Sequence, residues 1–190
     1  MLFRKKIEGT FRLEKLIKGC SRGDRKAQET LFSLYYGYAM SVALRYSHCH
    51  EKAADITNDS FLKVFSNVEL FREEAEFKFW LRKIVVNTAL DHYRKEKKHE
   101  NQVPLEKGFN ELIDESVLDQ LQAEDILKMV QDLPEIYRFT FNLYEIEGYS
   151  HEEIALKLGT TAGTSRANLS RAKHMLRVMI INLSAYERVV

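Results

Sequence analysis

The sequence predicts an all-α protein, built from two small helical domains on an acidic flexible linker, the second domain being a helix-turn-helix. Hydrophobic residues form 45% of the 190-residue chain, enough for a buried core. Two prolines and eight glycines are too few for the many tight turns of an all-β protein. Apolar residues also recur at helical spacing in several long segments.

Neither a membrane helix nor a signal peptide is expected, because no apolar run approaches the ~18 to 20 residues that span a bilayer. Cys20 and Cys49 are isolated thiols, a usage that suits a reducing cytoplasm. We therefore expect a cytoplasmic protein.

Charge is strongly segregated along the chain, although the formal net charge is only +1. Residues 77–98 hold seven bases and two acids, residues 99–125 one base and eight acids, and residues 160–178 four bases and no acid. Two basic surfaces separated by an acidic segment are typical of a nucleic-acid-binding protein.

This pattern divides the chain into an N-terminal tail, two domains and a linker. The expected ranges are residues 1–24 for the tail, 25–97 for the first domain, 98–121 for the acidic linker and 122–184 for the second domain. Pro104 and Gly108 lie in the linker, which has little apolar periodicity.

Three helices are expected in the first domain, over residues 25–46, 51–67 and 77–97. The third is expected to bury a stripe of residues at positions i, i+3, i+4, i+7, i+8 and i+11. These are Phe77, Trp80, Leu81, Ile84, Val85 and Thr88.

Basic and aromatic residues alternate on this third helix, a combination suited to single-stranded DNA. Phe77 and Trp80 lie on the apolar stripe, so we assign them to the core rather than to base stacking. The candidate DNA contacts are Arg82, Lys83, Asn87, Asp91, Tyr93 and Arg94.

The second domain is expected to start with a helix over residues 122–132, followed by Pro134 in the first turn of the next helix. Ser150 and Glu153 form a capping box, and Gly159 ends that short helix. Thr161 then caps a helix running to about residue 181.

Residues 149–176 therefore predict a helix-turn-helix, whose second helix enters the DNA major groove. Ile154, Ala155 and Leu158 should pack against Leu169, Ala172 and Leu176. The opposite, basic face carries Thr164, Ser165, Arg166, Asn168, Arg171 and Lys173. An ordinary helical hairpin with a solvated basic face is the alternative.

An acidic face is expected on the second helix, where Asp55, Asn58 and Asp59 lie within one turn. It could be solvated, hold a metal or bind a basic partner. A metal ion bound at this face would find no third or fourth ligand nearby at suitable spacing. Cys49 lies between His48 and His50, but adjacent residues cannot easily converge on one tetrahedral zinc ion. No catalytic motif, cofactor site or small-molecule substrate site is expected.

Three segments in order resemble the extracytoplasmic-function sigma factors of bacterial RNA polymerase. AADITNDSFLKVF (residues 53–65) is similar to the family's polymerase-binding helix. FKFWLRKIVVNTALDHYRKEKK (residues 77–98) is similar to its minus-ten helix. LPEIYRFTFNLYEIEGYSHEEIALKLGTTAGTSRANLSRAKHML (residues 133–176) is similar to its minus-thirty-five domain.

The resemblance implies a function in promoter recognition, with core RNA polymerase, promoter DNA and an anti-sigma factor as partners. It implies that Asp55, Asn58 and Asp59 contact the polymerase, and that residues 68–76 pocket a flipped base. The second domain would read duplex DNA and the first a melted strand. Ala54 departs from the family, which usually has an acid there, and the altered sequence 164–168 leaves promoter specificity open.

The sequence leaves two other classes of protein as alternatives. A stand-alone helix-turn-helix regulator would bind duplex DNA without polymerase, commonly as a symmetric dimer. A metal-dependent enzyme using Asp55 and Asp59 would show turnover that a chelator abolishes.

Overall fold

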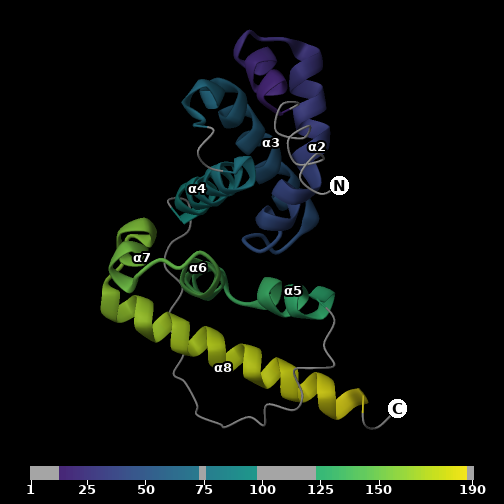
Figure 1. Ribbon diagram of the computed structural model, residues 1–190. Coiled ribbons are helices and arrows are strands. Elements are labelled where there is room, and N and C mark those ends of the chain that lie inside the picture. The colour runs from purple at the N-terminus through teal and green to yellow at the C-terminus, as the bar shows by residue number, and fades with distance from the viewer. Residues whose placement is uncertain (1–12, 73–75, 98–122, 188–190) are drawn as a thin grey trace. The chain divides into compact units, whose positions relative to one another are not determined.

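The computed structural model describes residues 13–72, 76–97 and 123–187, and throughout these ranges the regular structure is helical (Figure 1). The all-α prediction is confirmed. The chain divides into two compact units, Met1–Ala43 with Glu51–Ala89, and Leu44–His50 with Leu90–Val190. None of the described helices is both long enough and apolar enough to cross a bilayer. The predicted linker lies outside the described residues.

The first unit is built on α2 (Arg25–Ala43), nearly all of α3 (His50–Asn67) and the part of α4 (Phe77–Lys97) up to Ala89, with a short 3-10 helix, η1 (Val68–Leu70), after α3. The last residues of α4, from Leu90 on, belong to the second unit. Residues 13–21, which we expected as tail, are helical as well. The start and end of α4 are those predicted, whereas α2 ends three residues earlier than expected.

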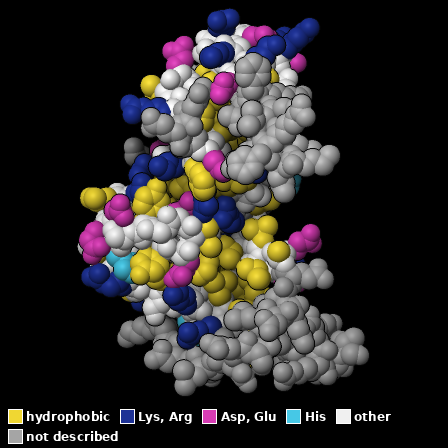
Figure 2. Space-filling view, viewed as in Figure 1, with side chains coloured by type: hydrophobic (Ala, Val, Ile, Leu, Met, Phe, Trp, Pro, Cys, Tyr) yellow, Lys and Arg dark blue, Asp and Glu magenta, His cyan; other side chains and the backbone are white. Residues whose placement is uncertain are grey.

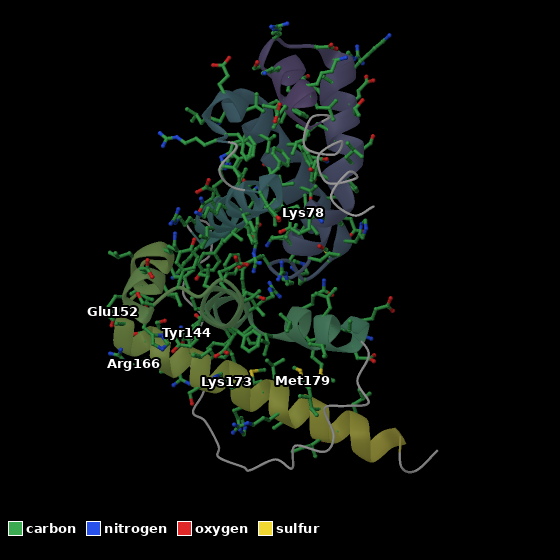
Figure 3. All side chains as sticks on the ribbon, viewed as in Figure 1. Lys78, Tyr144, Glu152, Arg166, Lys173 and Met179 are labelled. Carbon is green, nitrogen blue, oxygen red and sulfur yellow. The ribbon has the colours of Figure 1, made fainter. Side chains whose placement is uncertain are left out.

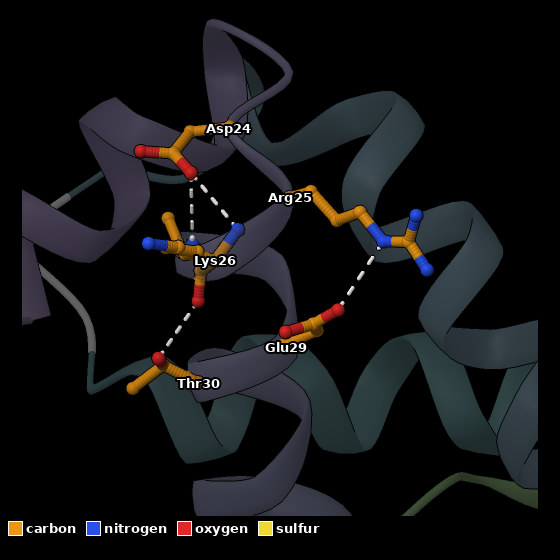
Figure 4. Close-up of polar contacts among 6 residues, drawn as sticks. Asp24, Arg25, Lys26, Glu29 and Thr30 are labelled. Carbon is orange, nitrogen blue, oxygen red and sulfur yellow. Dashed lines mark hydrogen bonds and ion pairs between the residues drawn. The ribbon is translucent and has the colours of Figure 1, made fainter.

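Asp24 determines where α2 begins. Its Oδ1 accepts hydrogen bonds from the backbone N–H groups of Lys26, at 2.9 Å, and Ala27, at 3.3 Å (Figure 4). The first N–H groups of a helix have no partner within the helix, so a capping carboxylate satisfies them. Within the first turn of the helix, Arg25 and Glu29 form an exposed i,i+4 ion pair, with 3.2 Å between Nε and Oε1.

The core of the first unit is apolar and rich in aromatic rings. Leu31, Ile56 and Leu81, one from each long helix, are almost fully buried. The rings of Phe32 and Phe61 lie 4.7 Å apart between centroids, joining α2 to α3. This packing fixes which faces of α3 and α4 are left toward solvent.

The second unit is organised by its longest helix, α8 (Ala162–Glu187), against which α5 (Ala123–Asp132), α6 (Glu135–Phe141) and α7 (His151–Leu158) lie (Figure 1). Between α6 and α7 the backbone forms a π-helix, η3 (Asn142–Ile146), which the sequence did not predict. The aromatic core centres on Phe139, whose ring centroid lies 4.7 Å from that of Tyr93.

Both predicted ends of α7 are confirmed. The Ser150 side chain accepts a hydrogen bond from the Glu153 backbone N–H, while the Glu153 carboxylate accepts one from the Ser150 N–H at 2.8 Å. That backbone hydrogen bond lowers the pKa of Glu153. The carboxylate's contribution is therefore complete above its ordinary pKa and is lost as the pH falls through the lowered one.

The turn between α7 and α8 depends on Gly159, whose φ of 66° lies in the left-handed region. Side chains with a Cβ adopt this conformation at a cost of ~1 to 2 kcal/mol. Gly163, in the first turn of α8, has no such φ, and a Cβ there would meet Thr161 Oγ1 at an ordinary 3.8 Å.

We predict that Gly159→Ala lowers the free energy of unfolding of the full chain by ~1 to 2 kcal/mol. The matched variant Gly163→Ala should leave it unchanged or raise it by up to ~1 kcal/mol, because alanine is the better helix former. Denaturant titration followed by circular dichroism measures both. Equal losses in the two variants would contradict a role for the left-handed turn.

Candidate nucleic-acid and partner-binding surfaces

The first surface is the solvent-facing side of α8, which begins with the predicted cap. Thr161 Oγ1 accepts a hydrogen bond from the Thr164 N–H at 3.1 Å and lies 2.9 Å from the Thr164 hydroxyl. Arg166 and Lys173 are exposed, and Arg171 is half-buried. These cations lie along about two turns of one helix.

The opposite side of α8 is fixed by packing on α7, as predicted. Ile154 and Leu158 of α7 and Leu169 and Ala172 of α8 are buried. Only Leu176 of the expected set is half-buried rather than buried. The arrangement of a short capped helix, a left-handed turn and a longer basic helix is a helix-turn-helix.

Two of the residues assigned to the basic face are placed differently. Ser165 is fully buried and Asn168 is 2% exposed. The Ser165 hydroxyl lies 3.0 Å from Nδ1 of His151, and the His151 ring stacks on Tyr144 with centroids 4.5 Å apart. Their spacing from the buried Ala172, at i−7 and i−4, places both on the packed side of α8, a signal that an assignment by polarity overlooked. These two side chains hold α8 in place rather than lying open to DNA.

Acidic residues from neighbouring elements pair with the cations of α8. Arg166 Nη1 lies 3.6 Å from Glu152 of α7, and Lys173 Nζ lies 2.7 Å from Glu145 of η3 (Figure 3). In the space-filling view, basic and acidic side chains lie side by side over α7 and the adjoining part of α8 (Figure 2). All four side chains are substantially exposed, so solvent screens both pairs.

The second surface is the outer side of α4. Lys78, Lys83 and Asn87 are exposed and Arg82 is half-buried. Phe77 is 2% exposed, which confirms its assignment to the core, and Trp80 is half-buried with its ring 5.6 Å from that of Phe77. Sequence reasoning missed Phe79, which is 58% exposed on this surface.

The C-terminal end of α4 is less accessible to solvent at Tyr93 than the first part of the helix is at Lys78 and Lys83. Tyr93 is 4% exposed, and burial, followed by the negative charge of Glu135, raises its pKa to about 12. Arg94 is exposed and pairs with Asp91 at 3.3 Å, an i,i+3 contact. In this structure Tyr93 is therefore a core residue and is unavailable for the DNA contact that we expected of it.

The third surface is the outer face of α3. Asp55 and Asn58 are exposed and Asp59 is half-buried, while the opposite side of the helix carries the buried Ile56 and Phe61. Leu62, at i+7 from Asp55, is 65% exposed and extends this face. It too was missed, since an isolated leucine carries no pattern. Across the described ranges, no three His, Cys, Asp or Glu side chains are grouped so that they could hold a metal ion.

Comparison with known proteins identifies both helical parts. Residues 31–99 match the family Sigma-70 region 2, and residues 123–176 match Sigma-70, region 4. Together the two matches cover more than half of the chain.

Relatives align over nearly the whole of their own length. The RNA polymerase sigma-H factor of Pseudomonas aeruginosa is 29% identical over 176 residues, which are 86% of this chain and 91% of the relative. The ECF RNA polymerase sigma-E factor of Haemophilus influenzae is 28% identical over 173 residues, 85% of this chain and 91% of the relative.

A solved structure, the sigma factor RpoE in complex with the anti-sigma factor NepR from Bartonella quintana, aligns with a TM-score of 0.47. It is 24% identical, and the alignment covers 80% of this chain and 95% of that one. The two regional matches stand in the order predicted from the sequence, on the two sets of helices described above. The chain therefore belongs to the sigma-70 family, as an extracytoplasmic-function sigma factor that directs promoter recognition in transcription initiation.

Proposed function

We propose that the three surfaces divide the work of promoter recognition between them. The outer face of α8 reads the minus-thirty-five element as duplex, the outer side of α4 captures the minus-ten element as melted strand, and the outer face of α3 binds core RNA polymerase. The domain ranges proposed for this division are residues 25–97 and 122–184. The observation that carries the proposal is the presence of two separate cationic helix faces, each opposite a well-packed apolar face.

On α8, the side chains available to DNA are Thr164, Arg166, Arg171 and Lys173. An arginine that contacts a guanine edge through two hydrogen bonds supplies ~1 to 3 kcal/mol of base discrimination, whereas contacts to phosphate supply affinity and fix orientation. Arg166 lies nearest the helix N-terminus and is exposed, so we assign it to base contact. Arg171 and Lys173, farther along the helix, are assigned to phosphates.

Glu152 and Glu145 then have a function of their own. Each forms an ion pair with a cation of α8 when DNA is absent. That ion pair must break before the cation can contact a phosphate or a base. Because the two carboxylates also repel phosphate, they lower the affinity for every sequence by a similar amount, so that only a site that adds good hydrogen bonds to Arg166 is bound tightly.

On α4, we assign Arg82, Lys83 and Asn87 to the melted strand, with Asp91 and Arg94 at the far end. The residues of the segment 68–76 that are described, 68–72 and 76, lie directly before α4. They are in the right place in the sequence to form one side of a base pocket, while residues 73–75 lie outside the described ranges.

On α3, we assign Asp55, Asn58 and Asp59 to the polymerase. Carboxylates that lie on the solvent-facing side of a helix are suited to binding a basic partner surface. There charge complementarity speeds association and fixes how the two proteins are positioned against each other. Leu62 beside them supplies an apolar contact that solvated acids alone would lack.

We also propose that the chain is not an enzyme by itself, needs no cofactor, and acts on the cytoplasmic transcription machinery, with catalysis supplied by the polymerase. An anti-sigma factor is proposed as a further partner that would cover one or more of these surfaces.

In vitro transcription with core polymerase across a library of promoters tests the proposal. We expect transcripts from a small set of promoters only when this protein is added. A stand-alone regulator would instead bind duplex sites without polymerase. Failure to associate with core polymerase that lacks a sigma subunit would refute the proposal.

We predict that Asp55→Lys weakens association with core polymerase at least tenfold, because it places a cation against a basic partner surface. The control Glu29→Lys makes the same charge change at an exposed position on α2 and should leave association unchanged. Competition against another sigma factor for a limiting amount of core polymerase measures both. Equal effects of the two reversals would show only a dependence on net charge.

We further predict that substitutions at two residues of α8 affect two different quantities, DNA binding and stability. Arg171→Ala should reduce by about one the slope of log binding constant against log salt, as expected for one lost phosphate contact, with stability unchanged. Ser165→Ala should leave the slope unchanged and lower the free energy of unfolding by ~0.5 to 1.5 kcal/mol, because the buried His151 contact is lost. Holoenzyme binding to duplex promoter over a salt series, together with denaturant titration, separates the two roles.

A further inference from the structure

The corner between the helix of residues 13–21 and α2 carries cations that the functions proposed above leave unassigned. Residues 15–26 contain five bases and one acid, and all five bases are exposed. They are Lys15, Lys18, Arg22, Arg25 and Lys26. Lys and Arg side chains gather over this end of α2 in the space-filling view (Figure 2). Most charged surface residues are only solvated, so the surroundings of the corner decide whether it has a function.

The acids near the corner leave most of these cations without a counter-charge. Asp24 accepts hydrogen bonds from two backbone N–H groups at the start of α2 (Figure 4). Glu29 pairs with Arg25, with 3.2 Å between Oε1 and Nε. Within the part of the chain that the structure describes, three of the five cations form no ion pair, and these are Lys18, Arg22 and Lys26. They are therefore open to an anionic partner.

The backbone holds the corner in one geometry. Gly23, with a φ of 74°, donates a hydrogen bond to the carbonyl of Cys20 at 3.0 Å, and the N–H of Asp24 donates to the carbonyl of Gly19 at 3.0 Å. This pair of bonds is the Schellman ending of a helix. A Cβ on Gly19 would lie 2.6 Å from the Cβ of Ala27, so the two helices approach more closely there than a side chain allows. The cations are thus presented from a fixed turn.

A cationic corner without an apolar anchor fits a phosphate backbone better than it fits a protein. Protein interfaces are centred on aromatic or aliphatic side chains that become buried on binding. Along the described chain, the nearest large apolar side chain that is exposed is Leu34, two turns after Lys26. Phosphates need only cations, hydroxyls and N–H groups, and binding them releases counterions.

DNA that is bound by α4 can reach this corner. Both belong to the first unit, where the ring of Tyr35 on α2 lies 4.7 Å from that of Phe77, the first residue of α4. Nine residues of helix separate Lys26 from Tyr35, which is ~14 Å at 1.5 Å per residue. At 3.4 Å per nucleotide of one strand in a duplex, the corner lies ~4 to 6 nucleotides from the start of α4.

We propose that Lys18, Arg22 and Lys26 bind the phosphate backbone of promoter DNA beside the segment that α4 captures. This inference rests on the proposed function of α4 and adds a second DNA contact to the same unit. The cations meet phosphates and no base edges, so the contact contributes affinity and salt dependence rather than sequence specificity.

The test uses holoenzyme and the promoter most active in the transcription assay, with the minus-ten segment unpaired between two duplex arms. The triple variant Lys18→Gln, Arg22→Gln, Lys26→Gln should bind this template about 10- to 100-fold more weakly, and the slope of log binding constant against log salt should fall by ~2 to 3. On a template cut back to the unpaired segment alone, the variant and wild-type protein should bind equally. An equal loss on the short template would overturn the proposal.

Glu29→Gln should have the opposite effect. It releases Arg25 from its ion pair, so binding to the long template should strengthen by up to ~5-fold and the slope should steepen by up to about one. Unchanged binding would show that cations at this corner do not meet DNA.

Matched single variants control for net charge and for folding. Lys18→Gln should weaken binding about 3- to 6-fold, whereas Lys128→Gln, which removes an exposed cation from α5, should not. Lys18→Arg keeps the charge and should bind as wild-type protein does. The free energy of unfolding should be the same in all of them, because none of these side chains is buried. Equal effects of Lys18→Gln and Lys128→Gln would reduce the result to net charge and overturn the proposal.

Two other partners are distinguished in the same set of variants. A loss of association between the triple variant and core polymerase would assign the corner to a protein contact. Clusters of basic residues also bind anionic lipids. If wild-type protein binds vesicles of phosphatidylserine and phosphatidylcholine, and the triple variant loses this binding but keeps its affinity for DNA, the corner is a lipid contact. Either result would overturn the proposal.

The template assay also separates this inference from the function on which it rests. If wild-type protein does not bring core polymerase to the long template, the proposed function of the chain fails. If it does so and the triple variant binds with the same affinity and the same salt slope, only the role of the corner is lost.

Discussion

The packing of α7 on α8 is the contact on which the DNA-facing geometry of the second unit depends. Ile154, Leu158, Leu169 and Ala172 are buried at this contact, so one side of α8 is fixed in the interior and the other is left to solvent. Because residues along a helix face repeat about every 3.6 positions, burying Leu169 and Ala172 leaves Arg166 and Lys173 at the borders of the buried stripe, where both are exposed. The left-handed conformation of Gly159 ends α7 and begins the turn that leads into α8. An apolar contact thus determines where the charges lie.

The same division between a buried and a solvated face operates on α3 and α4, with different chemistry on the outer side. On α3 the outer side is acidic and ends in an exposed leucine, and on α4 it is cationic and carries an exposed ring. An acidic face is repelled by DNA and attracted to a basic protein, whereas a cationic face with a ring favours nucleic acid. One small helical unit can therefore offer a separate surface to each of two partners. The negative charge of α3 and the positive charge of α4 stay on different faces.

Much of this arrangement could be predicted from the sequence, and the reasons are local. Ser150, Glu153 and Gly159 define α7 through hydrogen bonds and a backbone conformation that depend on adjacent residues only. The bounds of α4 follow from its long apolar stripe. Two assignments failed because chemical type was given more weight than spacing. Ser165 stands at i−7 from the buried Ala172 and Tyr93 at i+3 from the buried Leu90, so both lie on the packed sides of their helices, where Ser165 meets His151 and Tyr93 meets Phe139.

The paired carboxylates on α8 bear on how such a small protein discriminates between DNA sequences. A wholly unopposed cationic helix binds any phosphate backbone, because the electrostatic contribution is independent of sequence. Glu152 and Glu145 set a fixed electrostatic penalty that every site must overcome, and only a site that adds hydrogen bonds to its bases recovers it. In the proposed division of work, sequence selection falls to the duplex-reading helix α8 and capture of the opened strand to α4.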